Sequence, residues 1–246
     1  MASNVSLNKT TQRPIPPVGQ HLAVCFQIID MGTQLIQFKP GAEPKATPQI
    51  YIGWEFCNPK LRAVFDKEKG EQPMAIFQKY SMYLGPKANL GMMLNSWLSS
   101  EIKEMNFEKW NKLAGRTCMI QVVHNPDAKK KDDVTGKAIM YANIGMKGLA
   151  IFPRPTEVPL PAGMVNEKLV LFLDHFNWEA FNKVPKFLQE MIKHSAEWSG
   201  ILKQHGQNPM DAAAEIPAET ESFEEREEAI GNAHTTSGMS EEDLPF

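Results

Sequence analysis

Apolar residues alternate with other residues over several short stretches of the chain. The clearest case lies in residues 49–57, where every second position is apolar: Ile50, Ile52, Trp54 and Phe56. Strict alternation is typical of a strand that buries one face. The same pattern, interrupted by Gly- and Pro-rich turns, predicts five strands. Their expected ranges are 21–38 with a bend at 31–33, 49–57, 74–84, 116–124 and 138–152.

Helical spacing replaces alternation in two parts of the chain. Between the third and fourth strands, apolar residues recur at intervals of three and four and predict two helices. Their apolar positions are Leu90, Met93, Leu94, Trp97 and Leu98, then Phe107, Trp110 and Leu113. Residues 181–198 predict one further helix.

Three strands, a helical segment and two strands is the chain order of an OB-fold. We therefore expect a mainly β protein with a five-stranded Greek-key barrel and a helical insertion between strands three and four. Ligands of that fold bind over strands two and three and the loops joining strands one to two and four to five. Here those loops are residues 39–48 and 125–137.

Composition divides the chain into four parts. Residues 1–18 are polar and Pro-rich, which predicts a flexible arm before the OB-fold domain of residues 19–152. Residues 153–204 are expected to pack on the barrel as an extension that carries the last helix. Residues 205–246 hold few large apolar side chains and predict a disordered acidic tail.

The net charge of −3 conceals a strong asymmetry. Residues 211–246 contain eleven acidic residues and one basic residue, so residues 1–210 carry a net charge of +7. A basic body beside an acidic tail indicates a polyanionic partner for the body and a separate role for the tail.

The compartment expected from the sequence is the cytoplasm. The three cysteines, Cys25, Cys57 and Cys118, lie far apart, which favours a reducing environment over a disulfide framework or a cysteine zinc site. The sequence contains no run of about 18 apolar residues, so we expect no membrane helix. The N-terminus lacks the apolar core of a signal peptide, so we do not expect secretion.

Catalytic motifs are not found, so we expect neither an enzyme nor a metal or other cofactor. Asp174 and His175 are adjacent, and adjacent side chains are expected to point apart. Cys118 lies among apolar residues, which indicates a buried thiol. Asp127, Asp132 and Asp133 flank three lysines, which favours a solvated loop over a metal site.

A single-strand binder needs cations for the phosphates and exposed aromatic rings for the bases. If the even positions of strand two face the core, one aromatic and basic face remains on strands two, three and five. Its members are Tyr51, Phe77, Lys79, Tyr83, Tyr141 and Lys147. The alternative is that half of these side chains belong to the barrel core or support the C-terminal extension, and a register error of one residue exchanges the two faces. Further phosphate contacts are expected from Arg116, Lys129, Lys130, Lys131 and Lys137, for which a solvated loop is the alternative.

The last residues of the chain form an acidic run that ends in an apolar residue, proline and phenylalanine. They read Glu241, Glu242, Asp243, Leu244, Pro245 and Phe246. Proline limits the entropy lost on docking, Phe246 supplies an apolar anchor, and the carboxylates can meet Lys or Arg around a pocket. This tip resembles the acidic tip of bacterial single-stranded DNA-binding proteins, which recruits replication, recombination and repair proteins.

Unlike the tip, the body of the chain resembles a phage-encoded family of single-stranded DNA-binding proteins. The patches that carry this resemblance are residues 19–30 and 32–34, 52–55, 79–81, 87–90 and 123–125. It implies a protein that coats and protects single strands in the cytoplasm of an infected bacterium. Because the tail is a polyanion tethered to a basic body, we also expect it to compete with DNA, so that deletion of residues 205–246 raises DNA affinity and abolishes partner recruitment.

Two alternatives remain open from the sequence. One is an interaction adaptor or decoy that uses the same tip and does not bind DNA; the other is an enzyme, for which the sequence shows no acidic metal cluster or nucleotidyl-accepting lysine motif. The small site of one OB domain favours a homo-oligomer or a cooperative filament on DNA.

Overall fold

The computed structural model describes residues 13–132, 135–145, 150–161 and 163–208. Lys147, the residues of the acidic tip and most of the expected N-terminal arm therefore lie outside the described residues.

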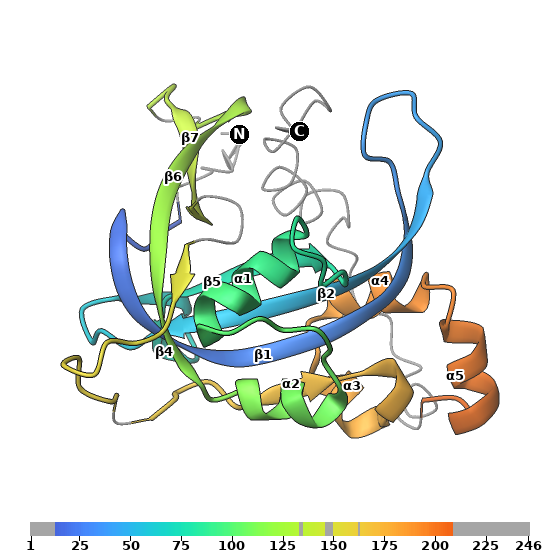
Figure 1. Ribbon diagram of the computed structural model, residues 1–246. Coiled ribbons are helices and arrows are strands. Elements are labelled where there is room, and N and C mark those ends of the chain that lie inside the picture. The colour runs from blue at the N-terminus through green and yellow to red at the C-terminus, as the bar shows by residue number, and fades with distance from the viewer. Residues whose placement is uncertain (1–12, 133–134, 146–149, 162, 209–246) are drawn as a thin grey trace, which may run out of the picture.

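Five long strands build the body of the protein (Figure 1). They are β1 (Gly19–Ile36), β2 (Lys45–Phe56), β5 (Ala75–Ser81), β6 (Thr117–Lys131) and β7 (Ala138–Ile144). Shorter strands are β3 (Arg62–Asp66), β4 (Gly70–Pro73), β8 (Ile151–Phe152) and β9 (Leu169–Leu171). The helices are α1 (Asn89–Leu98), α2 (Phe107–Leu113), α3 (Trp178–Lys183), α4 (Lys186–Lys193) and α5 (Trp198–His205).

The protein is mainly β, and its large sheet runs in the order β5-β2-β1-β6-β7 with antiparallel pairing along this path. β8 adds to β6, and β9 pairs in parallel with residues 27–29 of β1. The outermost strands β5 and β7 approach within 8 Å between Cα atoms. Among the described residues they share no ladder, so the sheet does not close into a barrel.

The main core lies between the concave face of the sheet and α1. The expected alternation in β2 is confirmed, because Ile50, Ile52, Trp54 and Phe56 are all buried in this core. Trp54 packs edge-on against Trp97 of α1, with ring centroids 6.1 Å apart. Burial of each such side chain contributes about 1.5–3 kcal/mol, so this one face of β2 is a major source of stability.

A second core covers the opposite face of β1 and β2. Residues 163–208 place α3, α4 and α5 against it, with Phe181, Leu188 and Ile192 packed on Ile29 and Met31. The strand β2 is therefore buried on both faces over most of its length.

The carboxylate of Glu55 fixes the start of this extension. It is buried, and it accepts hydrogen bonds from the backbone N–H groups of Val165 and Asn166 at 2.7 and 2.8 Å. The side-chain amide of Asn166 donates a third bond, at 2.7 Å. A single buried acid thus satisfies three donors and ties the extension to β2.

Several expected elements are wrong in detail. The single helix expected at 181–198 is three helices. Pro185 separates α3 from α4, because it disfavours helical backbone at the residue before it and lacks the N–H that would continue α3; α4 ends at Lys193 and α5 begins at Trp198. Strand four continues to Lys131, well beyond the expected end at residue 124. Residues 205–208, expected in the tail, belong to the body: Asn208 is buried and exchanges two hydrogen bonds with Asn182, at 2.8 and 3.2 Å.

Within the described ranges, none of the helices has the length and apolar character needed to span a membrane.

Candidate nucleic-acid interface

Two long hairpins rise from the same side of the body, with α1 between them in the view of Figure 1. The β1–β2 arm comprises residues 33–48, and the β6–β7 arm comprises residues 123–143. They contain the loops at which an OB-fold would bind its ligand.

The β6–β7 arm separates its charges by sign. Asp127 and Asp132 are each only 7% exposed and accept hydrogen bonds from the arm's own backbone. Lys129, Lys131 and Lys137 are exposed. Among the described residues of the arm, these two carboxylates are thus turned into the hairpin and these three lysines are exposed, which makes the described surface more cationic than its composition.

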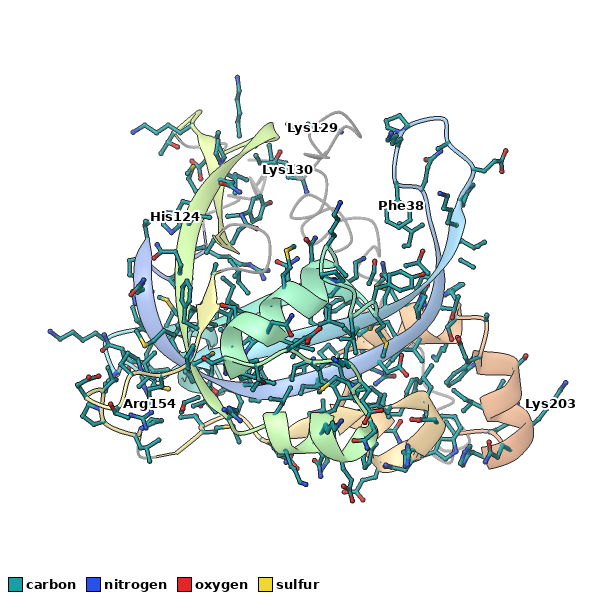
Figure 2. The ribbon with its side chains drawn as sticks, viewed as in Figure 1. Phe38, His124, Lys129, Lys130, Arg154 and Lys203 are labelled. Atoms are coloured by element: carbon teal, nitrogen blue, oxygen red, sulfur yellow. The ribbon has the colours of Figure 1, made fainter. Side chains whose placement is uncertain are left out.

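Lys130 lies beside Lys129 near the end of this arm and is half-buried (Figure 2). The described residues contain no cluster of three or more potential metal-ligating His, Cys, Asp or Glu side chains.

The β1–β2 arm carries exposed apolar side chains close to its turn. Phe38 is 57% exposed and Leu35 is 76% exposed, and Figure 2 places Phe38 on this arm. Lys39 follows directly and Lys45 begins the returning strand, both with exposed side chains. Phe38 was not among the residues expected to bind DNA, although its place beside a Lys-Pro-Gly turn was a usable signal.

Phe77 is the partly exposed end of a stack of aromatic rings on β5 and β2. Its ring is 40% exposed and lies nearly parallel to that of Tyr51, at 15° and 5.5 Å between centroids. Phe26 meets it edge-on at 5.8 Å. Gly53 pairs with Phe77 across the strands and leaves the space that the ring occupies.

Tyr51 is largely covered by other side chains. It lies on the face opposite the main core, as the alternation predicts, but Phe77 and Phe187 of α4 cover it and leave 6% exposed. Burial raises the pKa of its hydroxyl well above the usual value. Tyr51 therefore supports the packing of Phe77 and α4 in this structure, and direct contact of its ring with DNA stays an untested prediction.

The remaining residues expected to bind DNA lie in two regions, one on or beside β5 and β7 and the other just before β6. Lys79 is half-buried on β5 directly opposite Tyr51, and Tyr83 follows the strand with half its surface exposed. Tyr141 is half-buried on β7, a strand whose Cα atoms come within 8 Å of those of β5.

Arg116 does not join these residues. It is exposed immediately before β6 begins, whereas Lys129 lies near the other end of that strand. At about 3.3 Å per residue the two positions are roughly 40 Å apart along the strand.

The groups considered for catalysis are placed as follows. His175 Nδ1 lies 2.9 Å from Asp174 Oδ1, so the expectation that these side chains point apart is wrong; both are exposed, and the imidazole stacks on Phe107. The Cys118 thiol is buried as expected, and burial raises its pKa. The pKa of Cys57 is raised to about 11, chiefly by burial, so this thiol is protonated at neutral pH.

No known family model matches this chain, and no curated protein is significantly similar to it. The chemistry of the two arms and of β5 is therefore the basis for a function.

Proposed function

We propose that the protein binds single-stranded DNA without strong sequence preference, and that it coats and protects exposed strands. The observation that carries the proposal is the β6–β7 arm, in which Asp127 and Asp132 bond to the backbone while Lys129, Lys131 and Lys137 are exposed. Ammonium groups on a projecting hairpin suit the repeated phosphates of a nucleic-acid backbone.

Exposed aromatic rings favour a single strand over a duplex. Phe38 and Phe77 expose ring surface on the β1–β2 arm and on β5, and Tyr83 does so just after β5. Bases of a single strand are free to stack on such rings, and each stack contributes about 1–3 kcal/mol. In a duplex the base faces are already stacked on each other.

The proposal includes an OB-fold for the body. Its support is the five-strand path, the insertion of α1 and α2 between β5 and β6, and the close approach of the outermost strands. OB-folds are partly open barrels that bind ligands at the loops corresponding to the two arms.

The acidic tip completes the proposal. Residues 241–246 would recruit replication, recombination and repair proteins, in the cytoplasm of a bacterium that carries a phage. The tail would also compete with DNA for the arms. Since residues 205–208 pack on the body, the deletion that tests this begins at residue 209, and it should raise DNA affinity and abolish recruitment.

The decisive experiment is fluorescence anisotropy with labelled oligo-dT and a matched duplex at several salt concentrations. We expect tight binding to the single strand that weakens as salt rises, with a logarithmic slope of about 0.7 per bound phosphate. Absence of binding by both the full chain and the chain that ends at residue 208 would contradict the proposal and leave the adaptor.

Two pairs of variants locate the surface. Lys129→Ala should weaken binding, whereas Lys203→Ala, which removes an equal charge from α5, should not; Figure 2 places the two lysines on different parts of the molecule. Phe38→Ala should weaken binding more than Phe65→Ala, which removes a similarly exposed ring from β3. Equal effects within either pair would place the site elsewhere.

A further inference from the structure

Asp127 makes its hydrogen bonds inside the lysine segment. Its Oδ1 accepts the backbone N–H of Lys129 at 2.7 Å and that of Lys130 at 3.2 Å. A side chain that accepts from the backbone two and three residues later forms an Asx turn, which fixes the local path of the chain.

This turn coincides with an interruption of the β6–β7 ladder. The register is regular from Val122 to Pro126, and the next pair is Lys131 with Ala138. In a regular strand, successive lysines would point to opposite faces of the sheet. The ladder does not pair the residues between Pro126 and Lys131, so other hydrogen bonds must fix the direction of their side chains.

We propose that Asp127 is a positioning residue for DNA binding: its carboxylate holds the backbone of Lys129 and Lys130 and so sets how this lysine segment meets the phosphates. The inference rests on the proposed function. It assigns a favourable role to an acid in a site for a polyanion, where charge alone would make the acid unfavourable.

Two substitutions separate geometry from charge. Asp127→Asn and Asp127→Ala remove the same negative charge, but only asparagine keeps an oxygen that can accept the two N–H groups. If charge alone matters, both variants bind oligo-dT equally well and more tightly than the wild type. If Asp127 positions the lysines, Asp127→Asn binds at least as tightly as the wild type and Asp127→Ala binds more weakly.

The size of the expected effect follows from counterion release. A slope of about 0.7 per phosphate on single strands corresponds to about a fivefold decrease in affinity at 0.1 M salt for each phosphate that the lysines no longer bind. The salt slope of Asp127→Ala should fall by the same 0.7 or so per phosphate, whereas that of Asp127→Asn should not change. A purely structural role would lower the stability of Asp127→Ala and leave the salt slope of its folded population unchanged.

The protein is expected to stay folded in both variants, because Asp127 belongs to neither hydrophobic core. Thermal unfolding checks this, and amide hydrogen exchange at Lys129 and Lys130 should accelerate in the alanine variant only. If Asp127→Ala does not fold, Asp127→Ser replaces it, and its weaker acceptor should give an affinity below that of asparagine.

The outcomes distinguish the inference from the function on which it rests. If the wild type does not bind oligo-dT, the proposed function fails and the inference with it. If the wild type binds and the asparagine variant matches the alanine or serine variant in affinity and salt slope, only the role of Asp127 is overturned.

Discussion

The absence of a side chain at Gly53 allows the ring of Phe77 to lie across β2. A Cβ atom at position 53 would lie 2.7 Å from both Cδ1 and Cε1 of Phe77. That separation is far below the optimum of about 3.5–4.0 Å between carbon atoms. Gly53→Ala should therefore push the ring out of its stack on Tyr51 and change how it meets a base.

The expected decrease in binding follows from the value of one stacked base. At about 1–3 kcal/mol per base, removal of the platform lowers affinity for oligo-dT by about 5- to 150-fold. Stability should change much less. Alanine in a strand gains about 0.5–1 kcal/mol over glycine, and disruption of an aromatic pair costs about 0.5–1.5 kcal/mol.

Anisotropy with oligo-dT and thermal unfolding, measured on the same samples, test this separation of binding from stability. Phe77→Ala should weaken binding to a similar extent. The matched control is Gly200→Ala in α5, where an added Cβ meets no atom within 4 Å. Wild-type affinity in Gly53→Ala, or an equal decrease in Gly200→Ala, would refute the role given to Phe77.

Three further predictions concern the body. Glu55→Ala leaves the N–H groups of residues 165–166 without their acceptor and should lower the free energy of unfolding by about 1–3 kcal/mol for each donor that stays buried and unpaired, measured by urea denaturation; a decrease below about 1 kcal/mol in total would show that the extension is held elsewhere. Trp54→Ala should cost about 3–5 kcal/mol by the same assay, because it empties the centre of the main core; a small decrease would mean that the core collapses around the gap. Burial raises the pKa of Asp30, so its contribution to stability is full below the usual pKa of about 3.9 and is lost as the pH rises through the raised value. Asp30→Asn, compared with the wild type by denaturation at pH 4 and pH 7, should therefore be relatively more stable at pH 7, and an unchanged difference would contradict the assignment.

The long strands were predictable because their signal is local. Alternation in β2 identifies its core face without knowledge of any other element, and the helical spacing before β6 identifies α1 in the same way. The binding face was less predictable. Tyr51 has the alternation of an outward residue, and only the position of α4, more than 130 residues away in the chain, shows that its face is covered.

The β6–β7 arm shows a second limit of local sequence patterns, because the pattern predicts a loop where the structure has a strand. A segment with three consecutive lysines is typical of a loop, yet most of it continues β6, because Asp127 and Asp132 satisfy backbone groups that the ladder leaves open. Strand β9 has only three residues; the apolar run at 169–173 is compatible with a buried strand or a buried helix, and only the pairing with β1 decides between them.

The pairing of β9 with β1 also sets a time scale for synthesis. Gln27 pairs with Leu169, so 142 residues must leave the ribosome before this edge of β1 is closed. At about 5–20 residues per second, that takes about 7–28 s. During this interval the chain exposes an unpaired strand edge, a common starting point for aggregation, beside the apolar surface that the extension later covers. A chain that stops short of residue 171 cannot complete this pairing, so we expect it to aggregate more readily than the full chain.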